Sequence, residues 1–275
     1  MHGTIIRIIS NLYTVSSNGS NYECRARGLF KNKGITPLVG DKCIFDNKNN
    51  YILEIEPRKT ELTRPNIANV DAAIIVTSCK RPDFSAFLLD KMLVNVMLKD
   101  VEPIVLFTKY DLLNDEEKKS IDKIIEYYNK IGIHALINTD IGLLLKLIKN
   151  KIVCLTGQTG VGKSTFLNKI DPNLDLRTND ISDALGRGKH TTRHVELYRF
   201  GECFIADTPG FSALDVINDV DNIKFMFPEF DNDNCKFRDC KHMNEIGCKV
   251  IEQYKNGEIL SSRYENYKKM VMECK

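Results

Sequence analysis

The chain contains Gly157-Gln158-Thr159-Gly160-Val161-Gly162-Lys163-Ser164, which matches the Gly-x4-Gly-Lys-Ser pattern of a phosphate-binding loop. An apolar run at 152–156 reads as a buried strand before the loop, and 166–169 has helical character after it. In such a loop, backbone N–H groups converge on phosphates at a helix start, the lysine adds a point charge and the serine hydroxyl ligates Mg²⁺. We therefore predict a nucleoside triphosphate site that continues into Thr165, with Ser164 as a magnesium ligand.

A second motif, Asp207-Thr208-Pro209-Gly210, follows the apolar segment Cys203–Ala206 and has the form Asp-x-x-Gly. By itself this tetrapeptide is also compatible with an ordinary turn. Downstream of a phosphate loop it is the expected partner motif, in which Asp207 holds Mg²⁺, usually through water, and the Gly210 N–H contacts the γ-phosphate.

The segment Thr108-Lys109-Tyr110-Asp111 comes directly after the apolar run Pro103–Phe107 and is similar to the Asn-Lys-x-Asp base-reading motif of GTPases. A carboxylate at Asp111 can accept hydrogen bonds from the guanine N1–H and N2 amine, which adenine does not offer. In ordinary GTPases this motif follows the phosphate loop, whereas here it precedes it. The order of the motifs indicates a circular permutation.

Strands and helices alternate from Val70 to Phe211, which predicts an α/β fold with a mostly parallel sheet covered on both faces. We expect helices at 85–99 and 115–131, the second opening on acidic residues suited to a helix N-terminus. The expected strands are Ala72–Val76, Ile104–Phe107, Ile133–Ile137, Ile152–Leu155 and Cys203–Ala206.

Near the end of the chain, Cys235, Cys240, His242 and Cys248 lie within one short window. Three thiolates and one imidazole make a closed tetrahedral Zn²⁺ site with no open position for chemistry, so the metal is expected to be structural. The spacing differs from the common Cys-x-x-Cys, and unliganded or redox cysteines are the alternative. In the last expected helix, Ser261–Met272, an apolar stripe is interpreted as packing.

The composition fits a globular chain of one large or a few small domains, with 275 residues of which 43% are hydrophobic and 28% charged. We find no signal-peptide pattern and no apolar run near the ~20 residues that span a bilayer. Nine cysteines are an odd number, which makes a disulfide framework improbable. We expect a cytoplasmic protein without a membrane partner, acting as a monomer.

These motifs in this order resemble the RsgA family of circularly permuted GTPases that depend on the small ribosomal subunit. The similarity covers nearly the whole chain, and it extends to four further segments beyond the nucleotide motifs. These are Ala26–Gly28 with Pro37–Asp41, the stretch Gly188–Leu197, and the Cys/His window at 235–248.

The resemblance implies an OB-type β-barrel at 1–66, a circularly permuted P-loop GTPase domain at 67–212 and a helical zinc-binding domain at 213–275. It implies a GTPase of late small-subunit maturation, slow alone and stimulated by the subunit, whose nucleotide state controls binding and release. The implied partners are GTP, GDP, and the small subunit with its rRNA. The implied cofactors are Mg²⁺ with GTP and structural Zn²⁺.

The basic charge is concentrated in residues 1–66, where 10 basic and 6 acidic residues give a formal net charge of +4. Residues 67–212 have no net charge, and 213–275 carry −2. Because nucleic-acid affinity depends largely on such charges, the barrel is the expected RNA contact, although any one of these residues is also compatible with a solvated basic face. The candidate residues are Arg25, Arg27, Lys31 and Lys33.

The catalytic group is expected outside the Asp-x-x-Gly motif, because Phe211 stands where many GTPases have a water-orienting Gln. His190 precedes Thr191 and Thr192, one of which is expected to meet Mg²⁺. An imidazole can orient a water or accept its proton, and the resemblance points to the same histidine. The alternative is an ordinary loop histidine.

Two departures from the family pattern concern the base. Thr108 stands where relatives usually have Asn, which predicts looser guanine binding because a hydroxyl makes fewer contacts than a carboxamide. The second departure is at the expected base-supporting turn, where Asn138-Thr139-Asp140 stands in the place of the family's Ser-Ala. Two other functions stay open: a nucleotide-gated RNA-binding module with little turnover, and an ATP-using enzyme, against which Asp111 argues.

Overall fold

The computed structural model of the chain describes residues 1–26, 30, 34–63, 66–170, 195–207 and 220–274. The chain forms two compact units. The first consists of Met1–Ile74, Asp140–Thr156 and Gly162–Ala213, and the second of Ile75–Thr139, Gly157–Val161 and Leu214–Lys275. The division into three domains at 66 and 212 stays a prediction. No helix within the described ranges is long and apolar enough to cross a membrane.

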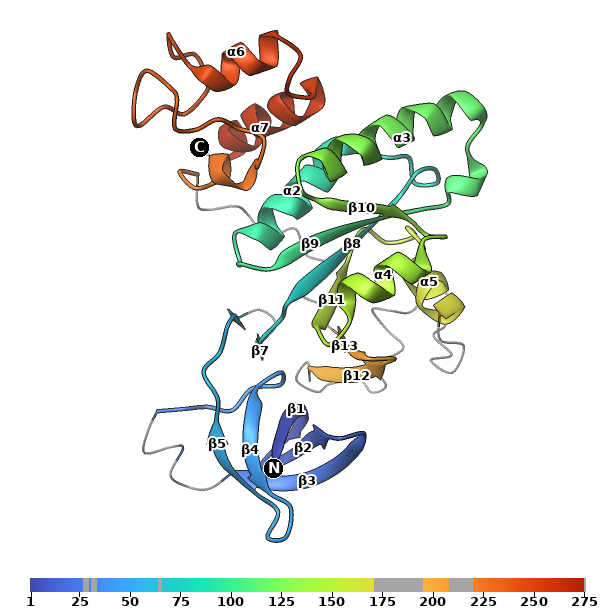
Figure 1. The fold of residues 1–275 in the computed structure, drawn as a ribbon, viewed down its shortest axis with the longest axis vertical. Coiled ribbons are helices and arrows are strands. Elements are labelled where there is room, and N and C mark those ends of the chain that lie inside the picture. The colour runs from blue at the N-terminus through green and yellow to red at the C-terminus, as the bar shows by residue number, and fades with distance from the viewer. Residues whose placement is uncertain (27–29, 31–33, 64–65, 171–194, 208–219, 275) are drawn as a thin grey trace. The chain divides into compact units, whose positions relative to one another are not determined.

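The N-terminal part is a five-stranded barrel (Figure 1). Its strand order is β1-β2-β3-β5-β4, and β1 also pairs with β4, which closes the barrel. One pairing, between β3 and β5, is parallel, and the others are antiparallel. Alternate residues point inward, as the period-2 pattern predicts, and fill a core of aliphatic, aromatic and cysteine side chains. The strands are β1 His2–Ile9, β2 Leu12–Ser17, β3 Ser20–Ala26, β4 Lys42–Asp46 and β5 Tyr51–Ile55.

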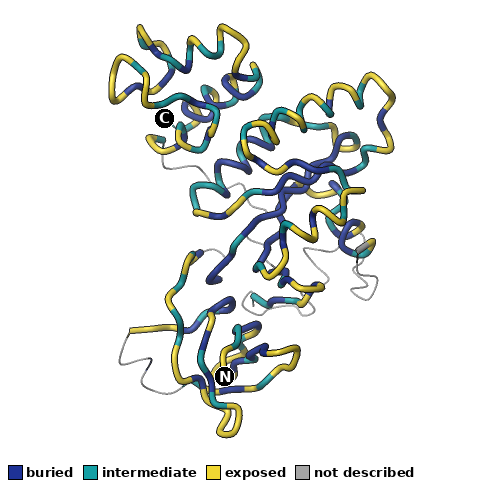
Figure 2. The backbone as a smooth tube through the Cα atoms, viewed as in Figure 1, coloured by how far each residue is buried: buried dark blue, intermediate teal, exposed yellow. Residues whose placement is uncertain are grey.

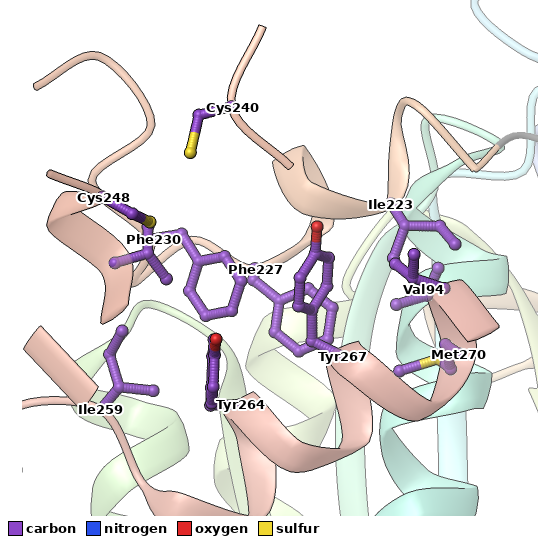
Figure 3. Close-up of a cluster of buried hydrophobic side chains, with 12 residues drawn as sticks. Val94, Ile223, Phe227, Phe230, Cys240, Cys248, Ile259, Tyr264, Tyr267 and Met270 are labelled. Atoms are coloured by element: carbon purple, nitrogen blue, oxygen red, sulfur yellow. The ribbon is translucent and has the colours of Figure 1, made fainter. Parts of the chain in front are cut away.

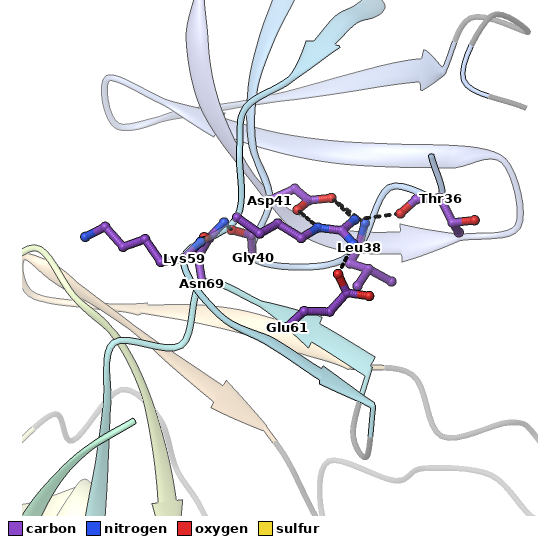
Figure 4. A network of polar contacts seen from close by, with 8 residues as sticks. Thr36, Leu38, Gly40, Asp41, Lys59, Glu61 and Asn69 are labelled. Atoms are coloured by element: carbon purple, nitrogen blue, oxygen red, sulfur yellow. Dashed lines mark hydrogen bonds and ion pairs between the residues drawn. The ribbon is translucent and has the colours of Figure 1, made fainter. Parts of the chain in front are cut away.

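A buried ion pair fastens the segment after β5 to the barrel (Figure 4). Arg58 donates two hydrogen bonds to the fully buried carboxylate of Asp41, at 2.7 and 2.8 Å, and one to the Thr36 carbonyl. Beside it, a Cβ on Gly40 would lie 2.0 Å from the Ala68 carbonyl oxygen, and φ there is +91°, so only glycine fits. The Pro37–Asp41 segment therefore anchors the segment that follows β5. That following segment includes β6 Glu61–Thr63 and β7 Asn66–Ala68.

The first unit also contains strands that extend the sheet beyond the barrel. β11 Ile152–Thr156 pairs in parallel with β13 Cys203–Asp207, and β13 pairs antiparallel with β12 Glu196–Phe200. β12 in turn pairs with β1 at Arg7 and Glu196. Two helices of this unit are α4 Ile141–Ile148 and α5 Lys163–Ile170. Helix α4 is absent from our sequence-based prediction, because a short, mostly apolar run is also compatible with a buried strand.

In the second unit, the strand order is β10-β9-β8. β8 Ala72–Ser78 begins in the first unit, and all of its residues are buried (Figure 2). β10 His134–Ile137 runs parallel to β9 Glu102–Thr108, as predicted for an α/β sheet. The predicted helices form as α2 Ala86–Met97, capped by Ser85, and α3 Asp115–Lys130, which opens with a capping box between Asn114 and Glu117.

The C-terminal segment packs around an aromatic cluster in the same unit (Figure 3). It contains η3 Ile223–Met226, α6 Lys249–Lys255 and α7 Ser261–Glu273. Tyr264 and Tyr267 of α7 are buried against Phe230, so the apolar stripe is packing, as predicted. Val94 of α2 belongs to the same cluster. This C-terminal segment, residues 220–274, is called the C-terminal module below.

Candidate nucleotide site and metal centre

The phosphate-loop sequence lies between β11 and α5, as predicted for this motif. Gly157 has φ of 143°, and a Cβ there would come 2.2 Å from the Val76 carbonyl oxygen of β8. Any larger residue would push the loop off the strand, which explains the first glycine of the motif. Lys163 begins α5, and burial lowers the pKa of its ammonium from the ordinary value. Ser164 is buried and Thr165 exposed.

The base-reading segment contacts the phosphate loop directly. Thr108, at the end of β9, is buried, and its hydroxyl lies 2.5 Å from the Val161 carbonyl oxygen and 3.2 Å from that of Thr77. Lys109 follows with φ of 56°, and its Nζ donates to the carbonyl oxygens of Gly160, at 2.7 Å, and Arg81. The base-reading segment and the phosphate loop, about fifty positions apart in sequence, are thus joined by two side chains and two backbone carbonyls. The Thr108 side chain therefore connects β9 to the phosphate loop. This contact could not be predicted from the position of Thr108 in the sequence.

Asp111 is exposed on η1 Tyr110–Leu112, immediately before the capped start of α3. An exposed carboxylate two residues after Lys109 is accessible to a ligand. The expected base-supporting turn begins at Asn138, whose N–H donates to the Phe107 carbonyl at 2.9 Å. The end of β10 is therefore next to the base-reading segment, because Ile137 pairs with Phe107 in the parallel register.

Asp207 ends β13, whose register with β11 pairs Ala206 with Cys154. Since the carboxyl ends of parallel strands meet at one sheet edge, this places the Asp207 backbone beside the residues that lead into the phosphate loop. The remaining residues predicted for this site lie outside the described residues: Gly210, His190, Thr191 and Thr192.

Of the predicted RNA contacts, Arg25 is exposed on β3, opposite Leu12 of β2 and Tyr51 of β5. Arg27, Lys31 and Lys33 lie outside the described residues.

The cysteine and histidine window forms a compact cluster. The ligand atoms of Cys235, Cys240, His242 and Cys248 all lie within 4.8 Å of one another. The two sulfurs of Cys235 and Cys248 are 3.9 Å apart, and the His242 Nδ1 is 3.5 and 3.3 Å from them. A Zn–S length of about 2.3 Å places tetrahedral sulfurs about 3.8 Å apart. The donor set and its spacing fit zinc.

Groups around the cluster orient its histidine. Asn232 Oδ1 lies 2.7 Å from His242 Nε2, so Nε2 carries the proton and Nδ1 faces the sulfurs. The His242 carbonyl accepts from the Tyr264 hydroxyl at 2.8 Å. Burial, and then the charge of Lys224, lowers the pKa of His242 to about 4, which keeps the imidazole neutral as a metal ligand must be. Asn232 is missed by sequence reasoning, because a lone Asn three positions before a cysteine has no motif.

The motif order, the loop contacts and the closed Cys₃His cluster define a class of protein: a permuted P-loop GTPase with an added barrel and a metal-binding module. The RsgA GTPase family model matches residues 55–217, and the RsgA N-terminal domain model matches residues 2–52. The chain belongs to the RsgA GTPase family.

Curated relatives cover almost the whole chain. It is 44% identical to the small ribosomal subunit biogenesis GTPase RsgA of Enterococcus faecalis, over 99% of this chain and 95% of the relative. The protein of the same name from Halalkalibacterium halodurans is 45% identical, over 99% and 97%.

Two solved structures share the fold at 34% identity. The crystal structure of YloQ, described as a circularly permuted GTPase, has a TM-score of 0.84 and covers 99% of this chain and 94% of its own. YjeQ from Thermotoga maritima has a TM-score of 0.83, with 99% and 98% covered. The permuted fold expected from the motif order is confirmed.

Proposed function

We propose that this chain hydrolyses GTP to GDP and phosphate as a biogenesis factor of the small ribosomal subunit. The observation that carries the proposal is the direct contact of the base-reading segment with the phosphate loop, from Thr108 to Val161 and from Lys109 to Gly160. This contact supports a nucleotide whose base and phosphates are held by one structure. Family membership and the names of the relatives support the subunit as partner.

The proposed roles follow the motifs. Asp111 reads guanine, and the phosphate loop with Lys163 holds the phosphates. Mg²⁺ would be held by Ser164 and Asp207 and by Thr191 or Thr192, and it would offset charge on the phosphate oxygens. His190 would orient or deprotonate the attacking water. Zinc at the Cys₃His cluster would be structural, because all four positions are occupied by protein ligands.

The proposed partner surface is the basic barrel, with Arg25 and its neighbours on the rRNA backbone. The subunit would stimulate a slow intrinsic rate by ordering the catalytic groups, and hydrolysis would release the protein from it. We propose that the protein acts in the cytoplasm and as a monomer.

Turnover of GTP and ATP, measured with and without purified small subunits, tests this function. We expect slow GTP hydrolysis alone, strong acceleration by subunits and no comparable use of ATP. Subunit binding that depends on GTP without accelerated turnover would instead support the nucleotide-gated RNA-binding module. Equal affinity for ATP and GTP would contradict the guanine assignment.

A further inference from the structure

A buried ion network joins the C-terminal module to α2. Arg263 of α7 donates to Asp90 of α2 at 2.6 Å and to Glu229 at 2.7 and 3.1 Å. The Arg263 side chain is only 1% exposed and that of Asp90 is fully buried. The guanidinium also lies over the Phe227 ring, 4.3 Å from its centroid. Removing one member of such a pair leaves an uncompensated charge in the interior, so the network tolerates little separation of the module from α2.

Helix α3 enters the same network through two consecutive tyrosines. The Tyr128 hydroxyl donates to Asp90 at 2.5 Å, and the Tyr127 hydroxyl accepts from the Leu260 N–H at 3.2 Å. Tyr127 also lies 3.4 Å from Glu229. Burial raises the pKa of Tyr128 well above its ordinary value, which keeps its hydroxyl a donor. The C-terminal module therefore holds the second half of α3.

The first half of α3 is tied to the base-reading segment. The Tyr110 hydroxyl donates to Asp122 of α3 at 2.8 Å. Glu117, in the first turn, accepts from Lys80 at 2.8 and 3.0 Å, and the Lys80 ammonium lowers the pKa of Glu117. Lys80 precedes Arg81, whose carbonyl accepts from Lys109 of the base-reading segment. Fewer than two helical turns separate Asp122 from Tyr128, so both ends of the contact path lie on one rigid segment.

We propose that the metal-loaded C-terminal module is a positioning element for guanine recognition, acting through α3 on the loop that carries Asp111. This inference rests on the proposed role of Asp111 as the base reader. The module holds α3 directly at the Tyr127 hydroxyl, and it reaches the Tyr128 hydroxyl through Arg263 and the shared Asp90 of α2. In turn, α3 holds the loop at Tyr110. Loosening the module lets α3 shift and weakens the contact of Asp111 with the base.

The consequence for a partner is reciprocal. A partner that grips the C-terminal module changes guanine affinity, and bound nucleotide changes the affinity for that partner by the same factor. This route does not use the γ-phosphate, so it acts on GDP as well as on GTP.

The test compares GDP with inosine diphosphate, which lacks the 2-amino group that the Asp111 carboxylate would accept from. The ratio of the two dissociation constants reports the base contact specifically, and a general loss of stability does not change it. The variants are Tyr128→Phe and Tyr127→Phe, each of which removes one hydroxyl and retains the ring. Tyr254→Phe is the matched control, because its hydroxyl bonds the exposed Glu265 within the module.

We expect Tyr128→Phe to weaken GDP binding about tenfold, which corresponds to ~1.4 kcal/mol. Binding of inosine diphosphate should weaken less than binding of GDP, so that the preference for GDP falls. Tyr254→Phe should bind both as the parent chain does. Stripping zinc with a chelator should reduce the same preference, and zinc readdition should restore it, with metal content followed by elemental analysis.

An unchanged preference for GDP in both tyrosine variants would overturn the proposal, and so would a zinc-stripped protein that stays folded and keeps the full preference. If stripped protein unfolds as a whole, the tyrosine variants decide. A parent chain that does not distinguish the two nucleotides would count against the base assignment of Asp111 itself, which separates failure of the proposed function from failure of this inference.

Discussion

At the residue scale, Thr108 has a structural task as well as a place in a motif. Its hydroxyl has one proton to donate, and the Val161 carbonyl at 2.5 Å is the nearer acceptor. The side chain is buried, so this bond is not exchanged with water. Thr108 therefore fixes the distance between β9 and the phosphate loop before nucleotide arrives.

Replacing Thr108 by Val should weaken GTP and GDP binding by roughly tenfold. The shape is kept, but the buried Val161 carbonyl loses its partner, which costs about 1–3 kcal/mol. Thr108→Asn, the residue usual in the family, should bind at least as tightly as the parent. Titration of both nucleotides measures this, and parent-like affinity in Thr108→Val would show that the bond is dispensable.

A second residue-scale prediction concerns His190. In His190→Ala, most of the acceleration by small subunits should be lost, with GTP affinity nearly unchanged, because in the proposed role the imidazole would act on the water and not on the nucleotide. General acid–base groups contribute about 10²–10⁴ in rate, which sets the expected loss. Subunit-stimulated turnover is the measurement. Full stimulation of the variant would move the catalytic role to a group supplied by the subunit.

At the scale of elements, the segment after β5 is fixed to the barrel by Arg58 and Asp41. Arg58→Met removes the guanidinium and leaves the buried Asp41 carboxylate uncompensated. Breaking such a pair costs about 3 kcal/mol where one partner retains some exposure. We expect the first unit to unfold at a lower urea concentration than in the parent chain, and a urea titration measures this midpoint.

The matched control is Lys59→Met. Lys59 forms an ion pair with Asp71 at 3.6 Å, and the lysine side chain is 72% exposed. Surface pairs of this kind contribute about 0–1 kcal/mol. The two variants should therefore differ clearly in stability. Equal effects would mean that the Asp41 site is more hydrated than its full burial indicates.

At the scale of the whole molecule, the charge is divided unevenly, with +4 on residues 1–66 and −2 on residues 213–275. Binding to small subunits should weaken as salt rises, with about one unit of log–log slope for each phosphate neutralised. Arg25→Glu should reduce that slope. Salt-independent binding would favour docking on protein.

Much of the candidate site is predictable from the sequence because each motif is local. The phosphate loop, the segment 108–111 and the Cys/His window each place their chemistry within a few consecutive residues. The permuted order follows from the positions of the motifs alone, and the five expected strands all form. Helix α4 escapes prediction because a short apolar run of eight residues is also compatible with a buried strand.

Contacts between distant residues follow a different rule. Arg263 and Asp90 are separated by 173 positions, and the Thr108 bond to Val161 spans 53. No periodicity or motif encodes such pairs, since they depend on which faces pack together once the helices and strands exist. The sequence by itself determined the permuted order of the motifs and the Cys/His window that forms the compact cluster, because both reside in short patterns. Only the tertiary structure decided that the C-terminal module grips α3, because burial of a charge depends on everything packed around it.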